Sequence, residues 1–445
     1  MKLLAKGIFT LVISLSIMFT STIGICGATV NKGKGDIKNI IFLIGDGMGV
    51  SFTSGYRYLK DNPATPELES TEFGPYLVGQ QTTFPNDPRH NVTDSAASAT
   101  AMATGVKTYN GAIGIGNDHS KLKSVLEVAK EKGKATGLVA TAPITHGTPA
   151  AFGAHVVKRK NMSAIADDYY DDLVNGNHKI DVLLGGGTDW FIRKDRNLVE
   201  EFVKEGYSYV TNLEELRNDH NPRLIGLFAK NGLPKWIDRP NGVPSLADMA
   251  GSAMERLNKN DNGFFLMIEG SQIDWAAHDN DIVGVMSEME DFEKAFRTAI
   301  DFAKKDGHTL VIATADHSTG GYTIGAGGQY NWFSSVVKAV KRTPDYMALK
   351  IAKGASVKNT LTKYIDFPLT KVEINSVHSA ARAQKIRNID NAIEEIINTR
   401  SFTGWTTKGH TGEDVNVYAF GPGSERFRGQ IDNTDHAKII FDILK

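Results

Sequence analysis

Carboxylate, imidazole and hydroxyl side chains gather in a few short motifs that follow or precede apolar runs of the sequence. Mixed His and Asp ligands suit zinc, whereas carboxylates with a Thr hydroxyl and water suit magnesium. The motifs are "GDGMG" with Asp46, "THGTPAAF" with His146 and Thr148, "EGSQIDWAAH" with Glu269, Asp274 and His278, "ADHSTGG" with Asp316 and His317, and "KGHTGEDV" with His410.

Each of these residues, taken singly, also has a purely structural explanation. An Asp after a strand is commonly a turn residue or a helix cap, and we favour that explanation for Asp46 alone. Asp274 and His278, four residues apart, would share one helix face as a solvated pair. The joint pattern is different, because so many acidic groups at one place would repel one another without cations. The motifs together therefore predict a metal centre.

A candidate nucleophile lies in "NVTDSAASATAMATG", residues 91–105. This Ala-rich stretch predicts a helix that begins at Asp94 and Ser95, where first-turn amides favour an anion. On this stretch alone, a cap and a nucleophile are equal alternatives for Ser95. A serine needs a base or a metal to attack at a useful rate, so metal ligands nearby favour the nucleophile.

Apolar runs that alternate with helical patterns must position these motifs. Runs that are apolar throughout predict strands buried on both faces, and their alternation with helices predicts a parallel sheet. We therefore expect an α/β three-layer sandwich with a mostly parallel central sheet, whose strand ends carry the functional groups. The expected strands are residues 37–45, 135–142, 181–186, 264–270, 309–315 and 415–421, and the expected helices are residues 121–133, 245–259 and 281–307.

The chain of 445 residues is long enough for one large domain or for two ordinary ones, and its 50 basic and 51 acidic residues leave a formal net charge of −1. No global field favours nucleic acid or an anionic membrane, so we expect no nucleic-acid partner. Residues 1–28 have the pattern of an export signal, with Lys2 and Lys6 before an apolar run and Cys26-Gly27-Ala28 at its end. The alternative is an uncleaved membrane anchor.

Cleavage of this signal would leave a mature chain without cysteine, because Cys26 is the only one. We therefore expect an exported protein, secreted or held at the cell surface or in the periplasm, without disulfides. The expected catalytic domain spans residues 29–445. Regular alternation fades from about residue 320 to residue 401, which predicts an inserted subdomain there.

The sequence resembles a bacterial alkaline phosphatase across essentially all of the mature chain. The motifs that carry the resemblance occur in the order of that family: "GDGMG", "TDSAASATAMATG", "HGTPAAFGAHVVKR", "EGSQIDWAAH", "TADHSTGG" and "GHTGEDV". The resemblance implies metal-dependent hydrolysis of phosphate monoesters, with broad specificity and an alkaline optimum. It also implies a homodimer.

The resemblance further implies a role for each motif. Ser95 would be phosphorylated during turnover, and Arg159 would hold two phosphate oxygens as a bidentate fork. One zinc would stabilise the leaving oxygen and later supply hydroxide, and a second would draw the proton from Ser95. The first zinc is implied at Asp274, His278 and His410, the second at Asp46, Asp316 and His317, and a magnesium at Asp46, Thr148 and Glu269.

Two positions depart from the best known enterobacterial pattern, which has Asp and Lys where this chain has His146 and Trp275. The pair resembles enzymes of Bacillus-type bacteria. A histidine ligand at position 146 makes zinc or cobalt an alternative to magnesium in the third site.

Rival functions remain at this stage. A phosphodiesterase, mutase or sulfatase would use the same metal scaffold, although "DSAASA" lacks the CxPxR-type motif of a sulfatase. A secreted phosphate-binding protein with a decayed site is a rival of another class. The presence of every expected ligand argues against it.

Overall fold

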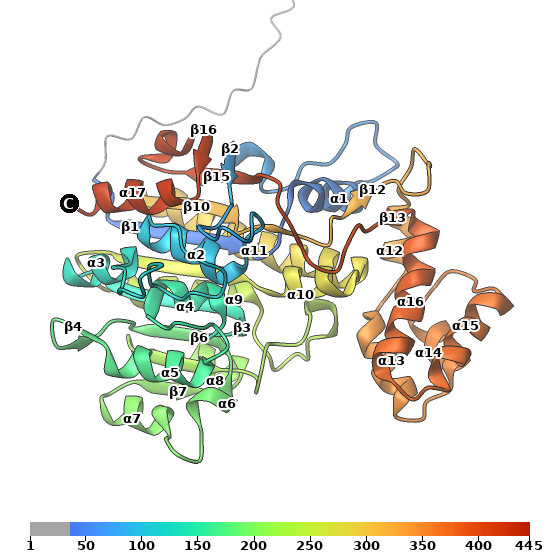
Figure 1. Cartoon of the computed structure of the whole chain (residues 1–445), viewed down its shortest axis with the longest axis horizontal. Helices are drawn as coiled ribbons and strands as arrows, with labels where there is room; N and C mark the ends of the chain where they lie inside the picture. The colour runs from blue at the N-terminus through green and yellow to red at the C-terminus, as the bar shows by residue number, and fades with distance from the viewer. Residues whose placement is uncertain (1–35) are drawn as a thin grey trace, which may run out of the picture. The chain divides into compact units, whose positions relative to one another are not determined.

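The computed structural model describes residues 36–445, so the predicted signal segment and Cys26 lie outside the described residues. A ten-stranded sheet forms the centre of this part of the chain (Figure 1). Its strands, in spatial order, are β16 (Gly429–Asp432), β2 (Leu77–Thr82), β15 (Val415–Phe420), β10 (Thr309–Ala315), β1 (Asn39–Gly45), β9 (Phe264–Gly270), β3 (Ala135–Pro143), β6 (Val182–Gly186), β8 (Leu224–Leu227) and β7 (Ser208–Val210).

The sheet is parallel except at β15, which pairs antiparallel with both β10 and β2. The six strands expected from apolar runs are all present, and β1, β3, β6, β9 and β10 are buried along their whole length. Burial on both faces explains why these strands have no polar alternation.

Helices cover both faces of the sheet, which confirms the predicted three layers. Successive residues of β1 point to opposite cores: Ile41 and Leu43 to one, Phe42 and Ile44 to the other. The first core is closed by α1 (Val50–Lys60), α8 (Leu213–Asn218), α9 (Leu246–Leu257), α10 (Gln272–Asp279) and α11 (Ile282–Asp306). The second is closed by α2 (Ser95–Thr104), α3 (Val125–Glu131), α4 (Gly147–Gly153), α5 (Met162–Asp171), α6 (Thr188–Phe191), α7 (Leu198–Lys204) and α17 (Thr434–Ile443).

Five helices lie within the predicted insertion and gather beside one another (Figure 1). They are α12 (Ser334–Lys338), α13 (Pro344–Ala352), α14 (Val357–Tyr364), α15 (Lys371–Ala381) and α16 (Ile386–Ser401). Their apolar residues continue the first core, and residues 36–445 belong to one compact unit. The domain division at about 320–401 therefore stays a prediction.

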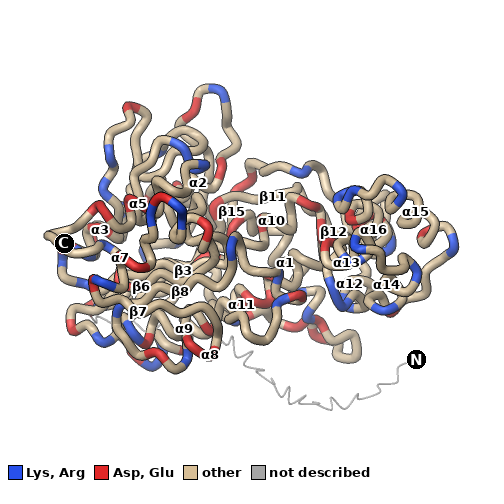
Figure 2. The backbone as a smooth tube through the Cα atoms, turned by 90° about the horizontal axis from the view of Figure 1, so that it is seen from below, with Lys and Arg blue, Asp and Glu red and all other residues tan. Residues whose placement is uncertain are grey.

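Short strand pairs complete the described chain: β4 (Leu173–Val174) with β5 (Asn177–His178), β11 (Ser318–Thr319) with β14 (His410–Thr411), and β12 (Thr323–Ile324) with β13 (Thr403–Gly404). Basic and acidic residues are interspersed along the backbone (Figure 2). Within residues 36–445, the helices are too short or too polar to cross a membrane.

Candidate active site

The carboxyl ends of the central strands bring the predicted residues to one edge of the sheet. Gly45 at the end of β1 pairs with Ala315 of β10 on one side and with Gly270 of β9 on the other. The residues that follow, Asp46 and Asp316, therefore emerge at the same level. The pairing of β11 with β14 places His410 beside Thr319, close to His317.

Ser95 is the first residue of α2, and Asp94 is the residue that caps this helix. The Asp94 side chain accepts a hydrogen bond from the Ala97 amide, which satisfies a first-turn donor. The Ser95 hydroxyl is therefore not needed as a cap. Its Oγ lies 3.1 Å from His317 Nε2 and 3.4 Å from Asp46 Oδ1, and the residue is only 1% exposed.

Asp46, Asp316 and His317 form the first group of ligand-type side chains. One ligand atom of each lies within 4.8 Å of the others, and all three residues are buried. His317 Nε2 is 3.4 Å from a carboxylate oxygen of both Asp46 and Asp316. The turn that follows Asp46 requires a glycine at position 47. Gly47 has φ of +69°, and a Cβ there would lie 2.7 Å from Thr319 Oγ1.

Asp274, His278 and His410 form a second group. Asp274 and His278 are one turn apart on α10, and His278 Nε2 lies 3.3 Å from Asp274 Oδ2. His410 Nε2 lies 3.1 Å from His278 Nε2 and 3.7 Å from Asp274 Oδ1. The other ring nitrogens contact main-chain oxygens, of Lys408 at 2.6 Å and of Thr93 at 2.8 Å, which fixes both ring orientations.

His317 also stands close to this second group, because its ring stacks on that of His410 with centroids 3.7 Å apart. Asp274, His317 and His410 themselves offer three ligand atoms within 4.8 Å of one another. His317 therefore contacts both groups. Two groups of ligands this close together are suited to two adjacent ions.

The third group combines Asp46 with Glu269 and His146. Glu269 Oε2 accepts a hydrogen bond from Ser271 Oγ at 2.6 Å. Thr148, on α4, is fully buried. The His146 ring makes an edge contact with Trp275, with centroids 5.6 Å apart.

Arg159 lies against the same site. Its Nη1 donates to Asp94 Oδ2 at 3.0 Å, and its Nη2 is 3.1 Å from His146 Nε2. Asp94 thus caps α2 and holds Arg159 with its two carboxylate oxygens. The guanidinium thus lies against Asp94, the residue before Ser95, and a guanidinium can bind a tetrahedral oxyanion with two parallel donors.

Several buried polar atoms in these groups have no hydrogen-bond partner within residues 36–445. Such atoms are rare in folded proteins and call for an unseen partner. The atoms are Asp46 Oδ2, His146 Nδ1, Thr148 Oγ1, Glu269 Oε1 and Asp316 Oδ2. Because they are oxygen and imidazole atoms that converge on one place, the donor set fits metal ions.

The pKa values of the buried carboxyl groups reflect the same excess of negative charge. Burial raises the pKa of Asp46 well above its usual range, and the charges of Asp316, Asp274 and Glu269 raise it further. Burial also raises the pKa of Glu269 to about 7 and that of Asp316 to about 6. Bound cations would stabilise the ionised carboxylates instead.

Two of the site histidines, His146 and His317, are by contrast held in the neutral form that binds metals. His278 differs, because burial lowers its pKa but the carboxylate of Asp274 outweighs burial and raises it to about 9. Burial lowers the pKa of His317 well below its usual value. Burial and the charge of Arg159 lower the pKa of His146 to about 3. Both imidazoles are therefore neutral near pH 7, as metal ligation requires.

Two hydroxyl residues at the site were not expected from the sequence. Thr319 donates to Asp274 Oδ1 at 2.5 Å, and Ser271 donates to Glu269. Both orient a carboxylate, and both lie inside motifs already identified, which was the only available signal. His155 lies outside the site and belongs to a partly buried ion-pair network with Glu127 and Asp172.

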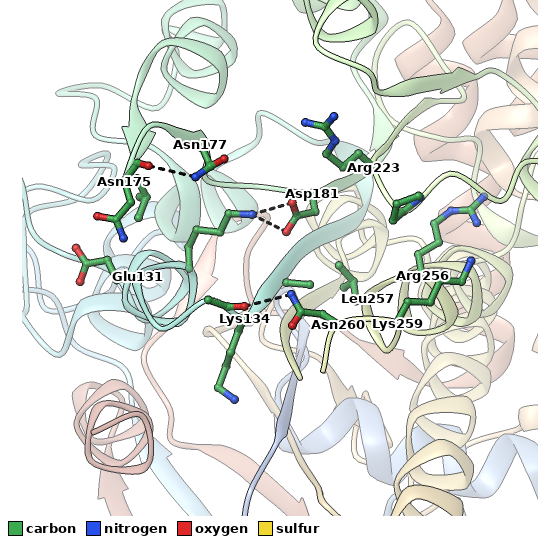
Figure 3. A pocket seen from close by; sticks show the side chains of 15 residues that line it. Glu131, Lys134, Asn175, Asn177, Asp181, Arg223, Arg256, Leu257, Lys259 and Asn260 are labelled. Carbon is green, nitrogen blue, oxygen red and sulfur yellow. Dashed lines mark hydrogen bonds and ion pairs between the residues drawn. The ribbon is translucent and has the colours of Figure 1, made fainter. Parts of the chain in front are cut away.

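A cavity of about 570 Å³ opens at the opposite, amino-terminal ends of β3, β6 and β8 (Figure 3). None of the predicted site residues lines it. Three of its basic groups are already engaged: Lys130 binds Asp181 at 2.7 Å, Lys134 Nζ donates to two main-chain oxygens, and Arg256 Nη2 donates to Asp219 O. The candidate site is therefore the carboxyl edge of the sheet.

Comparison with known proteins agrees with this geometry. The alkaline phosphatase family model matches residues 37–445. Alkaline phosphatase 3 of Bacillus subtilis is 66% identical over 418 residues, which cover 93% of this chain and 90% of that protein. The chain belongs to the alkaline phosphatase family. Like its relatives in that family, it is a metal-dependent enzyme that hydrolyses phosphate monoesters.

Solved structures of alkaline phosphatases have the same fold. The cold-active enzyme of a psychrophilic Shewanella matches with a TM-score of 0.86 and 40% identity, covering 92% of this chain and all of that one (100%). A variant of the enzyme from the Antarctic bacterium TAB5, with a histidine replaced by glutamate, has Mg bound in the M3 site. It matches with a TM-score of 0.68 and 30% identity, covering 92% of this chain and 98% of that one. Replacement of the histidine by aspartate likewise gives a structure with Mg bound in that site.

Proposed function

We propose that this phosphatase works through a phosphoserine on Ser95, with two zinc ions and one magnesium ion. The observation that carries the proposal is the place of the Ser95 hydroxyl. This hydroxyl is buried and has no capping role. It lies within 3.4 Å of ligand-type atoms of Asp46 and His317.

Each ion has a set of side chains that fits it. Asp274, His278 and His410 would hold the first zinc, and Asp46, Asp316 and His317 the second. Asp46, Thr148 and Glu269, with His146 beside them, would hold the magnesium, for which zinc or cobalt is the alternative. When bound, these metals supply Lewis acidity, which eases ionisation of a hydroxyl or water and neutralises charge on the phosphoryl group.

The residues of the chain then carry the reaction in two displacements. Ser95 Oγ loses its proton and forms a bond to phosphorus, while the bond from phosphorus to the ester oxygen breaks; that oxygen keeps the electron pair, takes up a proton and leaves as the alcohol. Water next attacks the phosphorus of the phosphoserine and gives up a proton, while Ser95 Oγ leaves with the bonding electron pair and regains a proton. The net products are an alcohol and inorganic phosphate, as phosphomonoester hydrolysis requires.

Arg159 would hold two oxygens of the phosphoryl group throughout both steps. Asp94 fixes one arm of the guanidinium, so little side-chain freedom is lost when the phosphate binds. Nothing in this set of contacts recognises the alcohol part of the substrate, which supports broad specificity for phosphate monoesters.

Export, cleavage after Ala28 and assembly as a homodimer belong to the same proposal. The pattern of residues 1–28 supports export, and the resemblance to bacterial alkaline phosphatases supports the dimer. If the signal is not cleaved, it would attach the protein to the membrane.

The first prediction tests Ser95 directly. Incubation with ³²P-labelled phosphate at acidic pH, followed by denaturation and peptide mapping, should place the label on Ser95. Ser95→Ala should carry no label. Its activity should fall by roughly 10³-fold, and the remaining activity would come from direct attack by hydroxide.

Ser98→Ala is the matched control, because Ser98 is equally buried one turn further along α2. It should still be labelled on Ser95. Label on another residue would refute the proposal, and turnover of diesters faster than monoesters would favour the phosphodiesterase alternative.

A further inference from the structure

A second acidic cluster lies where α10 ends and the helices of residues 334–401 begin to pack. Asp279 is the last residue of α10, Asp345 lies in the first turn of α13, and Asp390 lies in α16. One carboxylate oxygen of each is within 4.8 Å of the others. Oxygens on opposite sides of one calcium ion are about 4.8 Å apart, since each Ca–O distance is roughly 2.4 Å.

Two further carboxylates face this cluster, and the lysines beside it do not balance the charge. Asp281 is 2% exposed and Glu394 is 5% exposed. Lys235 Nζ donates to Asp345 Oδ2 at 2.5 Å and lies 3.4 Å from Asp281 Oδ2. Lys408 Nζ is 3.9 Å from Glu394 Oε2. Five carboxylates thus face two lysines. A divalent cation would reduce this excess of negative charge.

Asp390 points independently to a missing ligand. It is only 4% exposed, yet its Oδ1 has no hydrogen-bond partner in the described part of the chain. Glu394 Oε1, one turn along α16, is in the same condition. An ionised carboxylate buried in this way costs several kcal/mol unless a cation accompanies it.

The other acidic cluster outside the active site has no such need. Glu127, His155 and Asp172 surround Lys179, whose Nζ is 3.0 Å from Asp172 and 3.8 Å from Glu127. The lysine and the protonated histidine neutralise that cluster, so it calls for no metal.

We propose that Asp279, Asp345 and Asp390 bind a calcium ion that joins α10 to α13 and α16. The ligands are all oxygens, without the imidazole or thiolate that would favour zinc. The Asp345 side chain is 44% exposed, so water can complete the coordination shell. This site is distinct from the three catalytic metal positions and goes beyond the proposed function.

The ion would hold the end of the helix that carries Asp274 and His278. Asp279 follows His278 directly, and its main-chain oxygen accepts from Lys408 Nζ at 2.9 Å. The main-chain oxygen of Lys408 in turn contacts His278 Nδ1 at 2.6 Å. The calcium site therefore lies directly behind one active-site histidine and supports its orientation.

Calcium binding to the zinc- and magnesium-loaded protein tests the proposal. Equilibrium dialysis with ⁴⁵Ca²⁺, with both catalytic metals kept in the buffer, should give one calcium per chain. Asp390→Asn should weaken binding by at least ~10-fold, and so should Asp345→Asn. Glu395→Gln, which removes an exposed carboxylate from the same helix, should bind calcium within about twofold of the parent. No binding to the parent, or equal binding to Asp390→Asn, would overturn the site.

Thermal unfolding supplies a second readout, with phosphatase activity as the check that each variant is folded. Calcium should raise the unfolding temperature of the parent and of Glu395→Gln but not that of Asp390→Asn. Without calcium, Asp390→Asn should be at least as stable as the parent, because a repelled buried carboxylate is gone. Equal stabilisation of all three by calcium would show that the ion binds elsewhere and would overturn the proposal.

Discussion

Ser95 is available for chemistry because a neighbouring residue performs the structural task at the start of α2. Asp94 accepts the Ala97 amide with one carboxylate oxygen and holds Arg159 with the other. The hydroxyl of Ser95 is left facing Asp46 and His317. One carboxylate therefore positions both the proposed nucleophile and the proposed phosphate-binding arginine.

The residue at position 146 should set the metal preference of the third site. The residue at position 275 should set the affinity for phosphate. A neutral imidazole at His146 offers a nitrogen, whereas an aspartate would offer a hard oxygen and a negative charge that favour magnesium. Trp275 stands where the enterobacterial pattern has Lys, so we expect one cation fewer near bound phosphate, weaker product binding and faster release. The structural alternative is that Trp275 only packs against His146, as their edge contact allows.

The double variant His146→Asp with Trp275→Lys tests this second prediction. We expect tighter magnesium in a titration of activity, stronger inhibition by phosphate and slower turnover. The TAB5 variants with Mg in the M3 site, made by replacing a histidine with an acidic residue, support this direction. The single variant Trp275→Lys separates the two effects, since it should change phosphate inhibition and turnover but leave the magnesium dependence unchanged. An unchanged magnesium dependence would mean that His146 does not set the third site.

At the scale of elements, α3 and α5 are joined by the buried imidazole of His155. Its Nε2 lies 3.5 Å from Glu127 of α3, and its Nδ1 lies 3.7 Å from Asp168 of α5. Asp172 and Lys179 complete its charged surroundings. Burial disfavours the charged ring, but the nearby carboxylates of Asp168 and Glu127 outweigh burial and raise the pKa of His155 to about 9.

A third prediction follows for stability against pH. Because the folded pKa is raised above the unfolded value of about 6.5, the contribution is complete below pH 6.5 and is lost as the pH rises through about 9. The loss is on the order of 3 kcal/mol. His155→Gln should flatten urea-unfolding stability between pH 6.5 and 9, whereas the exposed His378→Gln should leave the parent profile. A parent profile as flat as that of His155→Gln would contradict the assignment.

The elements of this fold differed in how far the sequence could predict them. Strands such as β1 and β10 were predictable because burial on both faces leaves an unbroken apolar run. Strand β2 was not, since "LVGQQT" is polar and mostly not buried, and β7 and β16 are short and equally polar. The direction of β15 depends on where the chain returns, which no local pattern encodes.

The candidate site shows the same division. Carboxylates and histidines at strand ends could be predicted, because parallel strands bring their carboxyl ends together. The roles of Thr319 and Ser271 could not, since a hydroxyl reveals its partner only through tertiary contact. The choice between Asp94 and Ser95 as cap needed backbone geometry.

At the scale of the whole molecule, the metal centre and the stability of the fold depend on each other. Asp46, Glu269 and Asp316 are fully buried where the three central strands β1, β9 and β10 end. The cost of burying these carboxylates falls on the folded chain, and bound ions offset it. Each site saturated at 100 times its Kd adds about 2.7 kcal/mol to the stability of the folded protein.

Removal of the metals should therefore destabilise the protein in a pH-dependent way, which is the fourth prediction. Burial raises the pKa of Glu269 to about 7 and that of Asp316 to about 6, so without metals these groups take up protons on folding. The pKa values of these carboxyl groups in the unfolded chain are near 4. The stability of the metal-free protein therefore falls as the pH rises from about 4 toward 7, because the folded chain must ionise buried acids. In the loaded protein, cations replace those protons.

The measurement compares urea unfolding of chelator-treated protein with that of protein refilled with zinc and magnesium. The stability difference should widen by about 2 kcal/mol from pH 5.5 to pH 8. In Glu269→Gln with Asp316→Asn, the metal-free profile should lose part of its slope, because two of the acids that bind protons on folding are absent while Asp46 remains. A difference that stays constant with pH would show that the ions do not neutralise these carboxylates, and full activity of the metal-free protein would refute the metal centre itself.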